Sequence, residues 1–543
     1  MAKNPIIGAS ASRSKVKATM FERMFRKDSV QKTDVKMTID ARLGKIVVGL
    51  WLLISALLCL SITRQSLWID EGVTAWLASQ PNLGSLFKTL GSLATSESQM
   101  PLYVLYAWAW AKLFGTSEIA LRASNLPFGL LFLGALAWSS WRVFGRPFLW
   151  VIFGFSPFIW YYMNEARPYV AMMAFAAFAL AAWLAYYHDP MRFRKSAPWA
   201  CLVAIFLACG FHMLATFLIP VLGIFALVRG KERMAADRHV LRDWARALSV
   251  CSPAFFLLGV YFLWTLFRGA GGMRQRPGLG NIAYSLYEFL GLAGLGPPRN
   301  ALRVEPILQL IIPYWPWLAL GVLAWMGVFA VMVHCFFFKQ PYRLGWALWT
   351  SCIAGLIVFY AASSLVNFRF WGRHLAVFFP LFALLLVQLT ARKKPRLEGT
   401  VWLLLAFSWI VSDARLMLLP AYHKDDYRAA AKIALETAHQ TRGTIFWVAS
   451  PYAARYYGLQ FHGVGEDTTW PILGKATLAT NWNLEKAEEQ IKKLARNRQI
   501  ILVFSKPDLY DQNGAWETLI ATRRPEKIAS PNSFEIYIFR LNS

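Results

Sequence analysis

Long runs of apolar residues recur along most of this 543-residue chain. Runs such as 46–63, 121–141 and 402–419 approach the roughly 20 residues that a helix needs to cross the hydrocarbon part of a bilayer. The composition agrees, because 57% of the residues are hydrophobic, only 16% are charged, and the mean hydropathy is +0.39. The pattern predicts a polytopic α-helical membrane protein.

The order of the apolar runs predicts about eleven membrane spans. They are 46–63, 121–141, 148–162, 168–187, two within 198–228, 248–266, 312–338, 346–365, 375–389 and 402–419. The run 198–228 is too long for one span and has basic residues at both ends, so it predicts a hairpin that turns at 210–212. The run 101–114 contains Lys112 and does not fit as a full crossing. It predicts an interfacial or partly inserted helix.

The composition changes after Pro420. Amphipathic helical spacing is found at 425–439 and 484–498, and short runs rich in Ile, Val and Phe at 444–449, 499–504 and 534–539. Helices that alternate with strands predict a small α/β domain over 421–543, following a membrane domain over 46–420 and a basic tail over 1–45. Either a structural cap or a role in acceptor binding is compatible with this domain.

The net charge of +27 has a clear distribution. The tail 1–45 holds eleven Lys and Arg against four acids, and the clusters at 192–195, 229–246, 339–343 and 392–396 adjoin apolar runs. Cytoplasmic loops of membrane proteins carry this bias, so the charge indicates topology rather than nucleic-acid binding. It predicts a bacterial inner-membrane protein with a cytoplasmic N-terminus and an extracytoplasmic C-terminal domain. The six cysteines lie in apolar runs without metal-binding spacing, which indicates packing.

Acidic residues beside the membrane stand out in such a chain. Asp70 and Glu71 fall in the first predicted outer loop, 64–100, and Glu165 falls in the second, 163–168, just before Arg167. The predicted topology places both loops on one side of the bilayer. Ionisable groups near a bilayer either pair or take part in function. The structural alternative is an ion pair between Glu165 and Arg167, or between Asp70 and an arginine.

Arginines gather in the later outer loops, where cytoplasmic-type charge is not expected. The loop 268–305 contains five of them against two acids, and 367–374 adds two more: Arg268, Arg274, Arg276, Arg299, Arg303, Arg369 and Arg373, against Glu288 and Glu305. The planar guanidinium fork grips phosphate oxygens in pairs, so the pattern predicts a phosphate at the membrane surface. Contact with anionic lipid headgroups is the alternative. His212, at the turn of the predicted hairpin, is either a substrate ligand or a structural residue.

Several short motifs occur in an order that is typical of one superfamily. They are Trp68–Glu71, Gln99–Tyr103, Leu121-Arg122, Glu165–Tyr169, Gly372–His374 and Phe379-Pro380. Over residues 46–420 the chain therefore resembles the membrane glycosyltransferases of the protein O-mannosyltransferase and lipid A aminoarabinose transferase type, which have the GT-C fold. One departure is Gln99, because bacterial members often have a histidine at this place, and it leaves the acceptor side open.

The resemblance implies transfer of a sugar from a polyprenyl-phosphate donor to a lipid, glycan or protein acceptor on the outer face. It implies that Asp70 is the base and that Glu71 and Glu165 orient the acceptor or sugar, or hold a divalent ion. The expected ligands of the substrate and its phosphate are Arg167, Tyr169, His212, Arg274, Arg276, Arg369, Arg373 and His374. A single displacement implies inversion at the anomeric carbon. No metal is expected to be required, with a divalent cation as the alternative. Rival interpretations are a transporter or flippase of a lipid-linked sugar and a non-catalytic envelope assembly protein. Neither the sugar nor the acceptor follows from the sequence.

Overall fold

The computed structural model describes most of the chain. The described residues are 41–93, 95–233, 238–269, 275–303, 307–338, 343–388, 395–464, 468, 470–495 and 499–539. The chain divides into two compact units, residues 1–49 and 50–543. Among the predicted features, Arg274, Glu305 and the first forty residues of the basic tail lie outside the described residues.

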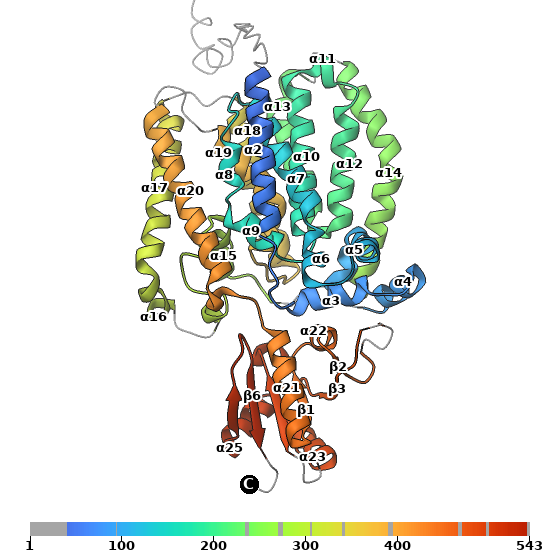
Figure 1. Ribbon diagram of the computed structural model, residues 1–543. Helices are drawn as coiled ribbons and strands as arrows, with labels where there is room; N and C mark the ends of the chain where they lie inside the picture. Colours follow the sequence, from blue (N-terminus) through green and yellow to red (C-terminus); the bar gives the residue numbers. More distant parts are fainter. Residues whose placement is uncertain are drawn as a thin grey trace, which may run out of the picture. The chain divides into compact units, whose positions relative to one another are not determined.

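Between residues 41 and 418, the described part of the chain is mainly helical (Figure 1). The α-helices are α2 (Ala41–Leu60), α3 (Ile69–Ala78), α4 (Leu83–Ser92), α5 (Pro101–Phe114), α6 (Glu118–Ala123), α7 (Leu126–Arg142), α8 (Trp150–Phe153), α9 (Pro157–Met163), α10 (Tyr169–His188), α11 (Pro190–Phe193), α12 (Ala197–Phe211), α13 (Leu218–Arg233), α14 (Arg238–Phe267), α15 (Leu279–Phe289), α16 (Ile307–Ile311), α17 (Trp315–Phe338), α18 (Arg343–Leu365), α19 (Phe379–Gln388) and α20 (Pro395–Leu418). Short 3-10 helices are η1 (Ser96–Gln99), η2 (Met213–Phe217), η3 (Ala301–Arg303), η4 (Ile312–Tyr314) and η5 (Gly372–Phe378).

The apolar helices make this chain a multi-pass membrane protein. In the described residues, seven helical segments are long and apolar enough to cross a bilayer, and three shorter ones are also apolar. The predicted division of the run 198–228 into two helices is confirmed, because α12 and α13 are separated by a break at His212 and η2. The predicted span 148–162 forms two short helices, α8 and α9. Pro157 begins α9, where a missing backbone N–H is tolerated. The total of eleven spans stays a prediction.

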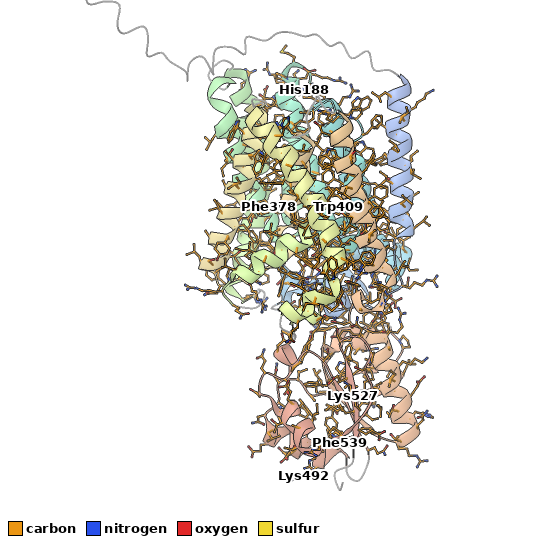
Figure 2. All side chains as sticks on the ribbon, turned by 90° about the vertical axis from the view of Figure 1, so that its left-hand side faces the viewer. His188, Phe378, Trp409, Lys492, Lys527 and Phe539 are labelled. Carbon is orange, nitrogen blue, oxygen red and sulfur yellow. The ribbon has the colours of Figure 1, made fainter. Side chains whose placement is uncertain are left out.

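The centre of the helical part is α10, which lies beside α7 and α12 (Figure 1). Its many alanines let neighbouring helices approach closely, and nearly every residue from Tyr169 to Leu180 is buried. Large aromatic side chains fill the remaining space, and Figure 2 shows Phe378 and Trp409 among the packed helices. Pro168 stands immediately before α10, which covers almost the same residues as the predicted span 168–187.

The C-terminal region is an α/β fold, as the sequence predicts. Its helices are η6 (Pro420–Tyr422), α21 (Tyr427–Thr441), α22 (Pro451–Tyr456), α23 (Leu484–Ala495), α24 (Pro507–Tyr510) and α25 (Ala515–Arg523). Its strands are β1 (Thr444–Val448), β2 (Leu459–Gln460), β3 (Gly474–Leu478), β4 (Ile500–Phe504), β5 (Glu526–Ala529) and β6 (Glu535–Phe539), in the sheet order β2-β3-β1-β4-β6-β5. Strands β2, β3, β1 and β4 are parallel, and β6 is antiparallel to both β4 and β5.

Alternate residues of β1 enter two separate cores. Ile445 and Trp447 pack with α21 and α22, whereas Phe446 and Val448 pack with α23 and α25. Successive side chains of a strand point to opposite faces, so helices cover both faces of the sheet. Residues that follow the carboxyl ends of the parallel strands therefore emerge at one edge.

The C-terminal region contacts α3 through α22. A Cβ at Gly72 would lie 2.5 Å from the backbone nitrogen of Ala453, so only glycine permits this close approach. The rings of Trp76 and Tyr452 stack with their centroids 4.8 Å apart, and the Tyr457 hydroxyl accepts a hydrogen bond of 2.7 Å from the Leu67 N–H. These contacts hold the start of α3 against the C-terminal region.

Candidate functional site

Asp70 lies in the first turn of α3, which begins directly after the extended residue Trp68. Its Oδ2 lies 3.1 Å from Nη1 of Arg373, and the two side chains are 22% and 15% exposed. Burial raises the pKa of Asp70, but the charges of Arg373, Arg167, Arg299 and Lys506 outweigh it and hold the pKa below its ordinary value. Asp70 is thus an ionised carboxylate that remains partly accessible.

The neighbouring acid, Glu71, is fully enclosed. It forms an ion pair with Arg122 in which Nε and Nη2 donate hydrogen bonds of 2.9 and 2.7 Å, and both side chains have no exposed surface. The Ala166 N–H donates a further bond of 2.8 Å. Burial raises the pKa of Glu71, but Arg122, Lys424 and these hydrogen bonds lower it to about 2. The contacts join α3 to α6 and to the turn at 165–167, and they fix the backbone that carries Asp70.

Glu165 is also buried, but it has a different environment. Lys424 lies 3.9 Å from its Oε1, and neither carboxylate oxygen has a hydrogen-bond partner. Burial raises the pKa of Glu165, and the charges of Lys424 and Arg373 oppose this effect without cancelling it. Lys424 also lies 3.5 Å from Glu71 and donates a hydrogen bond to the carbonyl of Asn164. Two acids therefore share one buried ammonium.

Arg167 pairs with Glu97 rather than with Glu165. Its Nη1 lies 2.5 Å from Oε1 of Glu97, and both side chains are almost completely buried. The same nitrogen lies 3.4 Å from the carbonyl of Asp70. The predicted alternative of a Glu165–Arg167 ion pair is therefore wrong: η1 supplies the acid. The other predicted alternative was an ion pair between Asp70 and an arginine. The structure contains this ion pair, and the arginine is Arg373.

Three cations surround the indole of Trp68. The charged groups of Arg373, Arg299 and Lys506 lie 5.3, 5.9 and 6.0 Å from the ring centroid. They come from η5, from the loop before η3 and from the segment after β4. The faces of aromatic rings attract cations, so Trp68 holds these three charges close to Asp70.

Several buried N–H groups in this cluster have no hydrogen-bond partner. They are Nε1 of Trp68 and Nε and Nη1 of Arg373, although that Nη1 is ion-paired with Asp70. Buried polar groups are normally satisfied, so unsatisfied donors near clustered cations suit an anionic acceptor. Glu288 is a further acid beside Arg299. It accepts a bond of 3.1 Å from Tyr284, and burial raises its pKa while Arg299 opposes the rise.

The other predicted ligands are distributed around this cluster. Arg369 stacks over Trp371 at 4.6 Å and donates a bond of 2.9 Å to Gln275, next to the exposed Arg276. Nδ1 of His374 accepts a bond of 2.9 Å from the Trp371 N–H.

The histidine of the hairpin has a structural contact. Nδ1 of His212 accepts a bond of 3.2 Å from the Leu214 N–H, and the ring lies 5.9 Å from that of the buried Tyr169. Burial lowers the pKa of His212 to about 3, and the charges of Arg167 and Arg373 add to the effect. His212 is therefore a neutral ring that caps the break between α12 and α13.

Sequence reasoning did not assign four charged residues to the site: Glu97, Arg299, Lys424 and Lys506. Arg299 was noted only as one of the arginines of the loop 268–305. Lys424 could have been found, because it follows the last predicted span on the outer face, where Lys is not expected. Lys506 gave no such signal, because it stands in a region of ordinary mixed charge. Lys506 lies near Trp68 only because it follows the carboxyl end of β4 in the folded sheet.

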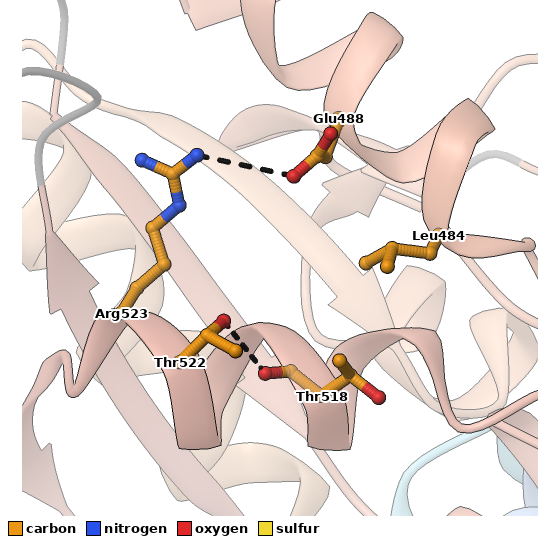
Figure 3. Close-up of a pocket in the computed structure, with 5 residues that line it drawn as sticks. All are labelled: Leu484, Glu488, Thr518, Thr522 and Arg523. Carbon is orange, nitrogen blue, oxygen red and sulfur yellow. Dashed lines mark hydrogen bonds and ion pairs between the residues drawn. The ribbon is translucent and has the colours of Figure 1, made fainter.

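Surface hollows of the C-terminal region are the alternative location for a site. One hollow of about 410 Å³ is lined by Leu484, Glu488, Thr518, Thr522 and Arg523 (Figure 3). Its charged groups are Arg523 and Glu488, which form a pair at 3.9 Å and are 31% and 41% exposed. Such pairs contribute little, so the cluster around Asp70 is the stronger candidate.

The cluster offers a defined chemistry. An accessible carboxylate can accept a proton, and the cations beside it can stabilise an oxyanion. Within the part of the chain that the structure describes, no group of three or more His, Cys, Asp or Glu side chains is placed to hold a metal ion. The site has the parts for a displacement in which a proton leaves one group and negative charge develops on another.

Comparison with solved structures identifies the fold. The chain resembles ArnT from Cupriavidus metallidurans in the apo state, with a TM-score of 0.55 and 15% identity over 92% of this chain and 98% of ArnT. It resembles ArnT bound to undecaprenyl phosphate with a TM-score of 0.54 and 14% identity over 90% and 97%. No protein-family model and no curated protein matches the sequence. The predicted GT-C fold is thereby confirmed.

Proposed function

We propose that this chain is a glycosyltransferase that moves a sugar from a polyprenyl-phosphate donor to an acceptor on the outer face of the bacterial inner membrane. The observation that carries the proposal is the pair formed by the accessible Asp70 and Arg373 beside two further cations. The shared fold with an ArnT that binds undecaprenyl phosphate supports a lipid-linked donor.

In this mechanism, Asp70 accepts the proton of the acceptor hydroxyl. The hydroxyl oxygen forms a bond to the anomeric carbon of the sugar while the bond from that carbon to the phosphate oxygen breaks. The bonding electrons leave with the phosphate, so the polyprenyl phosphate departs with increased negative charge. One displacement of this kind inverts the anomeric configuration.

Arg373 has two tasks in the proposal. Its charge stabilises the departing phosphate, an electrostatic contribution that is often the largest in catalysis. Before the donor binds, the same charge makes Asp70 a weak base by lowering its pKa. A bound phosphate shares the guanidinium with Asp70 and so raises the basicity of the carboxylate. The base is thereby strengthened when the donor is present.

Glu71 and Glu165 have supporting roles in this proposal. Glu71 fixes the turn that carries Asp70 through Arg122 and Ala166. Glu165 has two oxygens without hydrogen-bond partners, and burial raises its pKa, so it is suited to contact a sugar hydroxyl. We assign orientation of the sugar to Glu165.

We also propose that no divalent cation is required. Arg373, Arg299 and Lys506 supply the positive charge that a metal ion would otherwise bring to the phosphate. Activity should therefore persist in EDTA. Loss of activity in EDTA that Mn²⁺ restores would refute this part of the proposal.

Mass spectrometry of envelope lipids and glycans from a deletion strain tests the function. We expect one sugar modification to disappear and its polyprenyl-phosphate donor to accumulate on the outer leaflet. Expression of the wild-type chain should restore the modification, and Asp70→Asn should not. Accumulation of the donor on the inner leaflet would instead indicate a flippase, and restoration by Asp70→Asn would exclude the assigned base.

A further inference from the structure

The C-terminal region reaches the cluster around Asp70 with a lysine. Strand β4 ends at Phe504, and Lys506 follows it after one residue, Ser505. The backbone of Lys506 is in the left-handed region, with φ of 47°. Its ammonium pairs with the buried Asp425 and lies 6.0 Å from the centroid of the Trp68 ring. An ammonium can donate up to three hydrogen bonds, so it can serve an anion together with Asp425.

Hydrogen bonds to Ser533 connect the chain segments that carry Lys506 and Arg299. Ser533, in the turn before β6, accepts a bond of 2.6 Å at its Oγ from Asn300 and one of 2.6 Å at its carbonyl from Ser505. Asn300 follows Arg299 and Ser505 precedes Lys506. A single residue of the C-terminal region thus forms hydrogen bonds with the chain neighbours of both cations.

The grouping of charge indicates what the site accepts. Arg373, Arg299 and Lys506 approach one indole. Asp70 pairs with Arg373 and Asp425 with Lys506, and each cation has further N–H groups that can reach one shared anion. Nε1 of Trp68 and Nε of Arg373 are buried donors without partners. A phosphate oxygen would satisfy such donors and neutralise part of the charge.

We propose that Lys506 binds the phosphate of the lipid-linked donor, so that the C-terminal region completes the donor site. The inference rests on the proposed function for the identity of the donor. The C-terminal region then acts as part of the binding site and not only as a cap. The ligand class that fits both the cations and the neighbouring apolar helices is a phosphodiester that joins a sugar to a polyprenyl chain, together with the polyprenyl phosphate monoester that remains after transfer.

Binding of undecaprenyl phosphate and of undecaprenol to the purified full chain in nanodiscs tests the proposal. We expect Lys506→Met to weaken binding of undecaprenyl phosphate about 10-fold or more, as for a lost charge-assisted hydrogen bond, and to leave binding of undecaprenol unchanged. Lys506→Arg should retain most of the affinity. The control is Lys527→Met, which removes an equally charged but 42% exposed lysine of the same region.

The outcomes separate this inference from the proposed function. If the wild type does not prefer undecaprenyl phosphate to undecaprenol, the donor class itself is wrong. If the wild type shows the preference but Lys506→Met binds as Lys527→Met does, only the role of Lys506 is refuted. The double variant Lys506→Met/Asp425→Asn removes the carboxylate that the single change leaves unpaired. Recovery of phosphate binding in that variant would show that Lys506 acts only through Asp425, and would also refute the inference.

Discussion

Replacement of Glu71 by Gln isolates the energetic role of the enclosed acid. The change preserves the size of the side chain but removes the charge that faces Arg122. The guanidinium of Arg122 would remain buried without its carboxylate, and breaking a buried ion pair from one side costs about 3–5 kcal/mol. We therefore expect Glu71→Gln to be strongly destabilising although it retains every carbon atom.

The pKa of Glu71 gives an independent magnitude. The pKa falls from 4.5 to about 2 in the folded protein. At 1.36 kcal/mol per pKa unit, this shift corresponds to about 3 kcal/mol of stability. Because the folded pKa is depressed, the contribution is fully present above pH 4.5 and is lost as the pH falls from 4.5 toward 2. Both routes give a contribution of a few kcal/mol near neutral pH.

Denaturant titration in detergent micelles, followed by tryptophan fluorescence, measures the effect. Glu436→Gln is the matched control, because Glu436 forms a 3.8 Å pair with Lys432 at exposures of 58% and 72%. Such a surface pair contributes at most about 0.5 kcal/mol. Equal stability of the two variants at pH 7 would refute the reasoning. A penalty for Glu71→Gln that stays constant from pH 7 down to pH 3 would refute it as well.

Two further substitutions follow from particular contacts. Gly72→Ala places a methyl group 2.5 Å from the backbone nitrogen of Ala453, so it should loosen the C-terminal region and increase its cleavage in limited proteolysis. Gly91→Ala, which meets open space, should not, and equal cleavage of both variants would contradict the proposed contact. Arg373→Met removes the main charge that lowers the pKa of Asp70, so the acidic limb of kcat/KM, where Asp70 gains a proton, should move to higher pH. An unmoved limb would contradict the assignment of Asp70 as the base.

The sequence predicted the multi-pass helical architecture for a physical reason. Apolar runs of about 20 residues have few alternatives to crossing a bilayer. Acids beside the membrane are rare enough to be conspicuous, and the structure places Asp70 against Arg373 as the predicted topology requires. The strands with continuous Ile, Val and Phe, such as β4, were also predicted because they are buried on both faces.

The remaining features depend on contacts between distant segments. The pairing of Glu71 with Arg122 and of Arg167 with Glu97 cannot be derived from local spacing, because each joins residues 51 or 70 positions apart. Strand β2 has two residues and so gives no periodic signal. The convergence of Lys506 on Trp68 depends on the register and order of the sheet, which no single segment encodes.

The central claim is that Asp70 activates the acceptor hydroxyl. Single-turnover consumption of the polyprenyl-phosphate sugar by the purified protein, in the presence of its acceptor, tests it most directly. We predict that Asp70→Asn lowers this rate by about 10²–10⁴-fold while undecaprenyl phosphate binding persists. The control Asp189→Asn, at the cap of α11, should keep the wild-type rate. Turnover by Asp70→Asn at the wild-type rate would contradict the account.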